Sequence, residues 1–267
     1  MNKAQKAGAE IKAVEALAQG NSPVHRLSPL SKLAVTLVYI IITVSFNKYD
    51  FSALIVMLLF PVIGYQLSLI PVSTCFYKLR IVLPLVCAVG LFNPFFDREI
   101  MLRIGNIGIS GGVISMLTLM MKGVFSLMMS FLLVATTPID EICRGLRKIH
   151  FPKFLVSLLL LTFRYISVML DEVAVMTDSY HLRAPGQKGI GFRAWGSFLG
   201  QLVLRSSDRA NEIYSSMLLR GYTGEFNYAT AKKFSRFSPA VALILVVLFI
   251  IVRIFNLTSL TGLFTGR

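Results

Sequence analysis

The run IGISGGVISMLTLMMKGVFSLMMSFLLVA, residues 107–135, decides the class of fold to which this chain belongs. It contains a single charged residue, Lys122. The run is longer than the roughly 20 apolar residues that an α-helix needs to cross the hydrocarbon core of a bilayer. It therefore predicts a membrane-spanning helix, long enough to tilt or to bend at Gly123.

Other apolar stretches before and after this run predict further membrane spans. A proline inside a span, such as Pro84, is tolerated where neighbouring helices satisfy the freed backbone groups. Together with residues 107–135, these stretches predict an all-α, polytopic membrane protein with about five transmembrane helices. The four additional spans are expected over residues 33–46, 51–70, 81–96 (ended by Asn93-Pro94) and 239–251.

The composition supports a membrane protein. Of the 267 residues, 55% are hydrophobic and only 15% are charged, where a soluble domain has about a quarter charged residues. The net charge of +14 would suggest nucleic acid in a soluble protein, but no nucleic-acid-binding motif accompanies it. We therefore expect no nucleic-acid partner. The first 20 residues are polar and lack the apolar core of a cleavable signal, and the three cysteines have no disulfide-framework or zinc-site spacing.

The distribution of lysine and arginine predicts an orientation in the membrane. With the N-terminus in the cytoplasm, the inner segments hold 21 of the 27 basic residues. The predicted outer loops, 47–50 and 97–106, hold three basic and three acidic residues and are neutral. Because short cytoplasmic loops collect basic residues, the short loop with Lys78 and Arg80 and the N-terminal flank favour this orientation.

These patterns divide the chain into four parts: an N-terminal cytoplasmic segment (1–32), transmembrane helices 1–4 (33–135), a cytoplasmic region (136–238), and a last span with its tail (239–267). The cytoplasmic region holds 14 of the 27 basic and 8 of the 13 acidic residues. Leu155–Leu161 is apolar all round, but Arg164 and Asp171 follow before about 20 apolar residues accumulate. We expect a long interfacial or buried helix there rather than another span.

Cap and stop signals predict three helices in this cytoplasmic region. The first begins near Thr137, as an N-cap before Pro138, and ends before a break at residues 150–152. The second covers 153–182 and the third 193–219. Both long helices end in an arginine followed by turn residues, Arg183-Ala184-Pro185-Gly186 and Arg220-Gly221. A cation and a glycine are ordinary helix-stop signals, so each arginine by itself is also explained as a simple cap.

Several motifs together resemble the transmembrane (T) component of energy-coupling factor (ECF) transporters, closest to the cobalt/nickel-type T proteins. The resemblance covers nearly the whole chain from about residue 24. The motifs are His25-Arg26-Leu27-Ser28-Pro29 with Lys32-Leu33, Ala135-Thr136-Thr137-Pro138, Phe163-Arg164-Tyr165-Ile166 with Leu170-Asp171-Glu172, Leu182-Arg183-Ala184-Pro185-Gly186, Arg205-Ser206-Ser207-Asp208-Arg209-Ala210, Tyr214 with Met217, and Leu218-Leu219-Arg220-Gly221-Tyr222 with Gly224-Glu225.

This resemblance implies a function for the two helix ends. In the family, two cytoplasmic coupling helices end in Ala-Arg-Gly-like motifs, each docking in a groove of one ABC-type ATPase subunit. The implied docking residues are Arg183 with Ala184 and Gly186, and Arg220 with Leu219 and Gly221. The first site has Ala184-Pro185-Gly186 after its arginine, and the second has Leu219 where the family has alanine. The other implied partners are a substrate-binding S component in the prokaryotic cell membrane and the lipid bilayer.

The sequence lacks the motifs of an enzyme or a metal site. It has no Gly-x-x-x-x-Gly-Lys-Ser/Thr loop, so hydrolysis is expected from partner ATPases. His25, His150 and His181 have no metal-ligand spacing, and we expect no catalytic residue, cofactor or metal in this chain. From the resemblance we expect cobalt or nickel as the transported substrate. The alternatives are a vitamin-type or shared ECF module, a stand-alone permease and an intramembrane enzyme.

Two charged features have more than one interpretation from the sequence. Lys122 within a predicted span marks either a functional site or a lysine that snorkels or faces the protein, and we favour the latter. Arg205 and Asp208 have the spacing of an ion pair along one helix.

Overall fold

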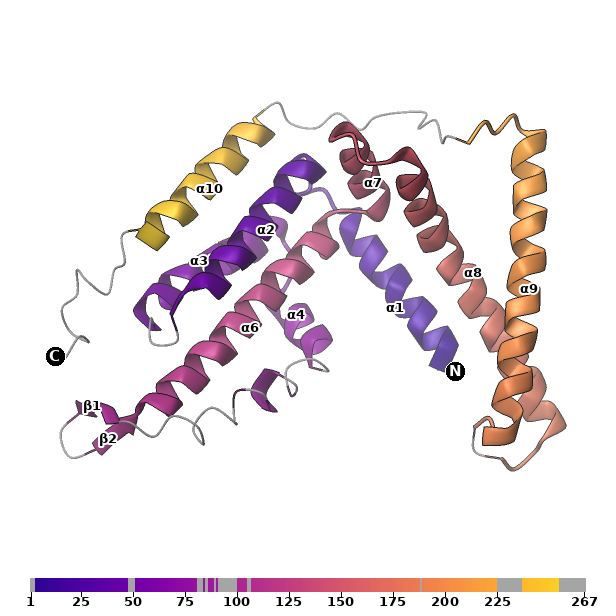
Figure 1. The fold of residues 1–267 in the computed structure, drawn as a ribbon, viewed down its shortest axis with the longest axis horizontal. Coiled ribbons are helices and arrows are strands. Elements are labelled where there is room, and N and C mark those ends of the chain that lie inside the picture. Colours follow the sequence, from indigo (N-terminus) through magenta and orange to yellow (C-terminus); the bar gives the residue numbers. More distant parts are fainter. Residues whose placement is uncertain are drawn as a thin grey trace. The chain divides into compact units, whose positions relative to one another are not determined.

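The computed structural model describes residues 3–47, 51–80, 84, 86–88, 90, 100–104, 107–187, 189–224 and 237–254. Apart from one two-stranded hairpin these residues are mainly helical, which confirms the predicted all-α membrane fold (Figure 1). The elements are α1 (Lys3–Ala18), α2 (Pro29–Ser45), α3 (Phe51–Ser68), α4 (Val72–Leu79), β1 (Ile100–Ile104), β2 (Ile107–Ser110), α6 (Gly111–Thr136), α7 (Ile139–Lys148), α8 (Lys153–Arg183), α9 (Phe192–Leu219) and α10 (Ser238–Ile254).

The chain forms two compact units. Leu17–Pro138 and Lys233–Arg267 make up the bundle unit, which includes α2, α3, α6 and α10. Met1–Ala16 and Ile139–Lys232 make up the long-helix unit, which includes α7, α8 and α9.

The bundle unit is held together by apolar packing around two buried tyrosines. α2 packs against α6 and α10, and α3 packs against α6. The Tyr39 hydroxyl donates to the carbonyl of Met57 at 3.0 Å, and that of Tyr65 to the carbonyl of Met128 at 2.9 Å. A buried phenol needs such a partner, because an unpaired hydroxyl in an apolar interior is costly. Each tyrosine therefore fixes the position of one helix against the next.

The N-terminus of α2 has capping features that follow from its sequence. Pro29 occupies the first turn, where its missing N–H costs no hydrogen bond. The Ser28 hydroxyl accepts from the N–H of Ser31 at 3.2 Å, as an N-cap does. The N–H of Ser28 donates to the hydroxyl of Ser238 at 2.7 Å, which joins the beginnings of α2 and α10.

At its other end, α2 is capped by two cations from neighbouring helices. Lys122 Nζ of α6 donates to the carbonyl of Val44 at 3.2 Å and to that of Phe46. Arg253 of α10 donates to the carbonyl of Ser45 at 3.0 Å, and its guanidinium lies 5.0 Å from the Phe46 ring centroid. Positive charge at a helix C-terminus is favourable because the last carbonyls lack intrahelical partners. Lys122 therefore faces the protein, the interpretation that the sequence favoured.

The helix predicted over 107–135 begins later than expected. Residues 107–110 form β2, which pairs antiparallel with β1, and α6 starts at Gly111. Ile107 and Ile109 alternate with smaller residues, a pattern of period two that suits a strand. Gly123, the predicted bend, lies within the α6 helix, where a Cβ would meet Val86 Cγ1 at 2.6 Å. The predicted span over 81–96 lies largely outside the described residues.

In the long-helix unit, the ends of the helices agree with the sequence prediction, but the predicted N-cap of α7 does not. α7, α8 and α9 end within a residue of the predicted positions, and His150, with a positive φ of 61°, turns the chain between α7 and α8. The predicted N-cap is wrong: Thr137 Oγ1 is buried and makes no hydrogen bond to any residue that the structure describes, and α7 starts at Ile139. Cys143 of α7 packs with Val156 and Leu160 of α8.

By length and composition, two described helices are apolar enough to cross a membrane, α6 and α8. The apolar helices α2 and α10 are shorter, and so is the apolar segment of α3 over residues 53–68. The placement of α8 outside the bilayer, and the total of five spans, stay predictions from the sequence.

Candidate docking ends of the long helices

The end of α8 is a tight turn centred on a proline and a glycine. Arg183 is the last helical residue, and the N–H of Ala184 donates to the carbonyl of Tyr180 at 3.0 Å. The N–H of Gln187 then donates to the carbonyl of Ala184 at 3.4 Å, closing a four-residue turn. Gly186, at the third position of this turn, has φ of +93°. Proline second and a positive-φ glycine third are the signature of a type II turn.

The loop after this turn is fixed to α8 by one tyrosine. The Tyr180 hydroxyl donates to the side-chain oxygen of Gln187 at 2.7 Å and accepts from the N–H of Gly191 at 3.3 Å. Gly191 is the residue from which α9 begins. Tyr180 therefore holds together the two sides of the loop that presents Arg183, a role that no motif in the sequence indicated.

The end of α9 has a different geometry, a Schellman motif. Arg220 is the C-cap, and Gly221 follows with φ of +78°. The N–H of Gly221 donates to the carbonyl of Leu218 at 2.9 Å, and that of Tyr222 to the carbonyl of Met217 at 3.0 Å. These two bonds satisfy carbonyls that the helix end would leave unpaired. The α8 end has no such pair, because Pro185 has no N–H to donate.

Each end places an exposed arginine beside an exposed leucine. Leu182 is 84% exposed and Leu219 is 90% exposed, and Arg183 and Arg220 are exposed as well. Arginine is enriched among the residues that anchor protein interfaces, since the guanidinium offers a rigid fork of donors. The local chemistry of both ends fits a protein partner.

The two ends lie at opposite ends of α9. Arg183 closes α8 just before the loop into α9, and Arg220 lies at the far end of α9. The 28 residues of α9 make a rod of roughly 42 Å at about 1.5 Å per residue. Arg183 with Ala184 and Gly186, and Arg220 with Leu219 and Gly221, therefore lie at two separate helix ends.

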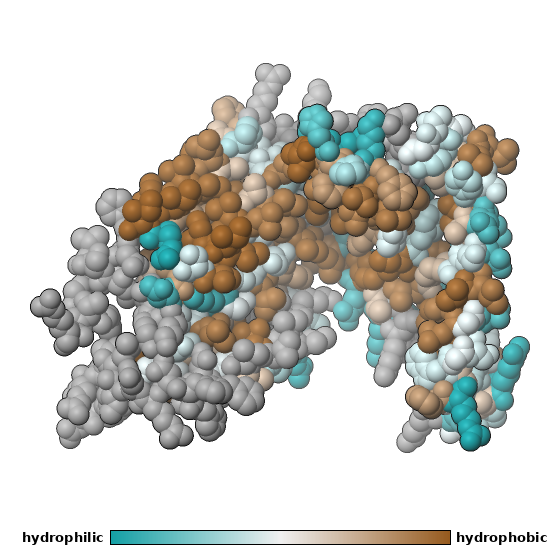
Figure 2. Space-filling model, in the orientation of Figure 1, coloured by the Kyte–Doolittle hydropathy of each residue, from teal (hydrophilic) through white to brown (hydrophobic). Residues whose placement is uncertain are grey.

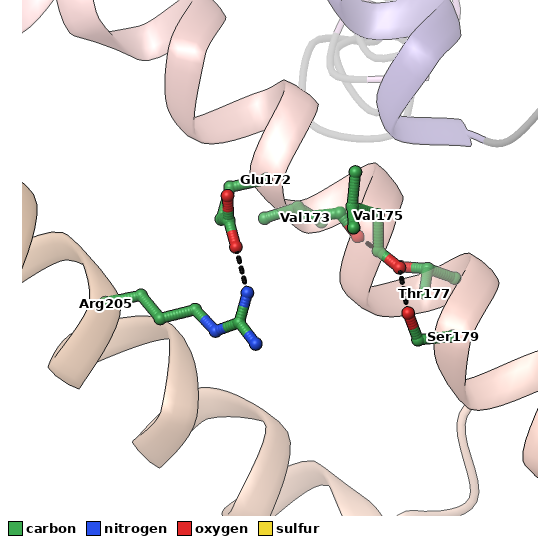
Figure 3. Close-up of polar contacts among 6 residues, drawn as sticks. All are labelled: Glu172, Val173, Val175, Thr177, Ser179 and Arg205. Carbon is green, nitrogen blue, oxygen red and sulfur yellow. Dashed lines mark hydrogen bonds and ion pairs between the residues drawn. The ribbon is translucent and has the colours of Figure 1, made fainter.

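An ion pair joins the middle of the two long helices. Arg205 of α9 pairs with Glu172 of α8 (Figure 3). The predicted pair between Arg205 and Asp208 is wrong, because the guanidinium reaches across to α8 instead of along its own helix. The sequence could not show this choice, since it depends on which face of α9 meets α8.

Along α9, all of whose residues the structure describes, no side chain is buried. Phe192, Leu219 and Val203 are examples of its large apolar side chains that are exposed. A helix gains most of its stability from packing an apolar face. Against the described residues of its own unit, α9 buries no apolar face of this kind.

The described residues at the two ends form no cluster of metal-binding side chains. Among the residues that the structure describes, no group of three histidine, cysteine or acidic side chains is placed to hold a metal ion. His181 lies in the last turn of α8 and contacts the Tyr180 ring, with centroids 6.1 Å apart. His25 is buried, with Nδ1 2.7 Å from the Ser22 hydroxyl and Nε2 3.0 Å from the carbonyl of Leu17.

Comparison with known proteins identifies the class. A helical membrane bundle joined to long exposed helices with arginine-tipped ends is the arrangement expected for the T component of an ECF transporter. The chain belongs to the family described as CbiQ, cobalt transport protein, whose model matches residues 20–230. It is a T component related to the cobalt and nickel types, and a membrane protein of a kind found in prokaryotes.

Individual relatives agree with this family. The energy-coupling factor transporter transmembrane protein EcfT of Lactococcus lactis subsp. cremoris is 27% identical over 220 residues, 77% of this chain and 82% of that protein. The nickel permease LarQ of Lactiplantibacillus plantarum is 26% identical over 98 residues, 37% of this chain and 36% of that protein. The cobalt transport protein CbiQ of Rhodobacter capsulatus is 27% identical over 101 residues, 38% of this chain and 41% of that protein. This chain therefore spans less than half of the two metal-named relatives.

Proposed function

We propose that this chain is the scaffold of an ECF importer and couples two partner ATPases to a substrate-binding membrane subunit. The observation that supports this most is the pair of exposed, arginine-tipped ends, Arg183 and Arg220, separated by the length of α9. Two docking points roughly 40 Å apart suit two separate ATPase subunits. The chain does not catalyse a reaction in this scheme, and nucleotide hydrolysis occurs in the partners.

The proposed coupling is mechanical. When two ATPases close around nucleotide, each carries the helix end that is docked in its groove. An α-helix transmits such a displacement along its axis as a rigid element. The Glu172–Arg205 pair joins α8 and α9 at mid-length, so movement of one helix is passed to the other and onward to the membrane subunits.

The docking chemistry is a charge-assisted contact. Each arginine would pair with a carboxylate or a set of carbonyls in the ATPase groove, and the neighbouring leucine would fill an apolar part of that groove. Removing one partner of a buried, hydrogen-bonded charge pair at an interface typically costs about 2–5 kcal/mol. Such a loss weakens association by more than tenfold, which makes the proposal testable by co-purification.

The test replaces each terminal arginine with glutamate in the full chain, co-expressed with its ATPase subunits. We expect Arg220→Glu to lose ATPase co-purification in mild detergent, and Arg183→Glu to lose one of the two contacts. Arg209→Glu is the matched control, because Arg209 is an exposed arginine on the same helix that pairs with Glu212 three residues further along. Equal recovery of ATPases with Arg220→Glu and Arg209→Glu would refute the docking role.

For the substrate we propose cobalt or nickel. The CbiQ family match over residues 20–230 supports this choice. A vitamin-type or shared module is the second candidate, because several relatives that match over about four fifths of their length are named EcfT. Metal accumulation in cells that express the chain with a metal-binding S subunit, compared with vitamin uptake alongside a vitamin-binding one, distinguishes these two.

We further propose that the N-terminus lies in the cytoplasm. The excess of lysine and arginine in the segments assigned to that side supports this orientation. A reporter fused to the N-terminus, active only in the cytoplasm, should give a signal; an inactive reporter on a stably inserted chain would contradict the orientation.

A further inference from the structure

The first turn of α9 presents two side chains whose position the helix itself does not explain. Phe192, the first residue of α9, is 95% exposed. Arg193 follows it in the first helical turn and is exposed as well. A cation at a helix N-terminus is opposed by the helix dipole, which favours negative charge there. The capping rule that accounts for Arg183 and Arg220 as ordinary helix stops therefore does not account for Arg193.

The loop between α8 and α9 holds this pair beside the candidate docking end at Arg183. The hydroxyl of Tyr180, in the same helical turn as Arg183, accepts from the N–H of Gly191 at 3.3 Å. Gly191 immediately precedes Phe192. The last turn of α8 and the first turn of α9 are therefore neighbours, and Leu182, which is 84% exposed, lies at the same end. Hydrophilic and hydrophobic side chains intermingle around this loop (Figure 2).

The local charge of this end differs from that of the other docking end. Residues 179–204 hold three basic residues, Arg183, Lys188 and Arg193, and no acidic one. Residues 206–224, which lead to and follow Arg220, hold two basic and two acidic residues and are neutral. A partner at the α8 end therefore meets a net positive charge with apolar side chains beside it, which favours a partner that offers carboxylates.

The backbone beside Phe192 favours a protein partner over a lipid bilayer. Gln187 and Gly189 are exposed in the irregular loop that joins α8 to α9. Irregular backbone does not face lipid in the hydrocarbon region, because its N–H and C=O groups find no partners there. Burial of Phe192 among lipid tails would carry the adjoining loop into that region. A protein surface can instead cover the aromatic ring and supply hydrogen-bond partners to the loop.

We propose that the ATPase subunit docked at the α8 end also binds the beginning of α9, where Phe192 fills an apolar part of its surface and Arg193 pairs with one of its carboxylates. This inference rests on the proposed function, because it extends the contact assigned there to Arg183. The α8 docking site then includes the end of one helix and the start of the next. Tyr180, which bonds to the backbone leading into α9, positions these two halves.

Photo-crosslinking in the complete complex identifies what Phe192 contacts. p-Benzoylphenylalanine replaces Phe192 in the full chain, which is co-expressed with its ATPase and substrate-binding subunits, and mass spectrometry identifies the crosslinked products. We expect a product with an ATPase subunit. Val203, an apolar residue further along α9 that is 64% exposed, is the matched control position and should give no ATPase product. The same probe at Leu182 and at Leu219 reports on the two docking ends themselves.

These probe positions separate failure of this inference from failure of the proposed function. ATPase products from Leu182 and Leu219 but none from Phe192 would overturn the inference and leave the proposed function standing. Products of Phe192 with lipid or with the substrate-binding subunit alone would do the same, as would equal ATPase yields from Phe192 and Val203. The absence of ATPase products from Leu182, Leu219 and Phe192 together would overturn both.

The salt dependence of ATPase binding tests the charge of Arg193. In low salt, Arg193→Gln should weaken binding of the purified ATPases about fivefold, because an ion pair is lost. In roughly 0.5 M salt the difference should shrink to less than about twofold, because salt screens exposed charges. Arg209→Gln, which alters another exposed arginine of α9, is the matched control and should bind ATPases as the unaltered chain does. Equal affinities of Arg193→Gln and the unaltered chain in low salt would remove Arg193 from the site and overturn the proposal.

Discussion

At the scale of single residues, the two candidate docking ends contain glycines with positive φ. Gly186 has φ of +93° and Gly221 has φ of +78°. At both positions a Cβ would have nothing within 4 Å to meet. The requirement for glycine therefore comes from the backbone conformation alone and not from close packing, since left-handed backbone is costly for residues with a Cβ.

We predict that Gly221→Ala weakens ATPase binding about five- to tenfold without preventing membrane insertion. A left-handed alanine costs about 1–2 kcal/mol, and this strain would loosen the Schellman motif that positions Arg220. Affinity of the purified chain for its ATPase subunits, measured by titration in detergent, checks the prediction.

Gly196→Ala is the matched control for this prediction. Gly196 lies within α9, and a Cβ there also has nothing within 4 Å. Alanine at this helical position should stabilise α9 by up to about 1 kcal/mol and leave ATPase affinity unchanged. If the two alanine variants bind ATPases equally, the shape of the turn after Arg220 has no part in docking.

At the scale of helices, the C-terminus of α2 is joined to two other helices of the bundle unit. Lys122 and Arg253 reach it from α6 and α10 and donate to three successive carbonyls, those of Val44, Ser45 and Phe46. The two cations therefore fix the positions of three helices along one another.

We predict that Lys122→Met and Arg253→Met each lower the melting temperature of the detergent-solubilised chain. A hydrogen bond to a charged group contributes about 1.5–3 kcal/mol, and Arg253, which binds one of these carbonyls, should contribute less than Lys122, which binds two. Because both cations bind the same helix end, the double variant should lose less than the sum of the single losses. Unchanged melting of Lys122→Met would show that its carbonyl contacts add nothing to stability.

At the scale of the whole molecule, each unit contains one buried cysteine that reports on its packing. Cys75 lies in the bundle unit and Cys143 in the long-helix unit, and both are buried. Burial raises the pKa of both thiols, and the Asp140 charge raises that of Cys143 further. The thiolate is the reactive form, so a raised pKa means less thiolate and slower alkylation near neutral pH.

We predict that a Cys87→Ser chain reacts slowly with maleimide at pH 7.5 and that the rate rises as the pH increases above 9. Unfolding in detergent denaturant should remove both the burial and the pKa shift, and labelling should then be rapid. Mass spectrometry of the labelled peptides assigns the rate to each cysteine. Rapid labelling of Cys143 in the folded protein would contradict its packing between α7 and α8.

The sequence predicted the long helices well because their signals are local. Pro185 and Gly221 stop α8 and α9 wherever the chain is placed, since a proline or a left-handed glycine acts on its own neighbours. The apolar run ending in Ala135 likewise predicted most of α6. Such signals need no knowledge of the rest of the fold.

The contacts between helices were beyond the sequence. Arg205 pairs with Glu172 and not with Asp208 because α8 lies beside α9. Tyr180 binds Gln187 and Gly191 only because the loop folds back over it. The role of Lys122 was ambiguous from the sequence, because it depends on the end of α2 lying within reach of the lysine side chain. Each case depends on the relative position of two elements, which periodicity and capping rules do not specify.

Pro185 has one consequence for the symmetry of the assembly. It leaves the α8 end with a type II turn while the α9 end has a Schellman motif. Two identical ATPases would offer two equivalent grooves to two helix ends of different shape. The twofold symmetry of the ATPase pair would therefore be broken where it contacts this chain. Two different ATPases, each with a groove shaped for one helix end, would instead bind in a fixed arrangement, one at the α8 end and the other at the α9 end.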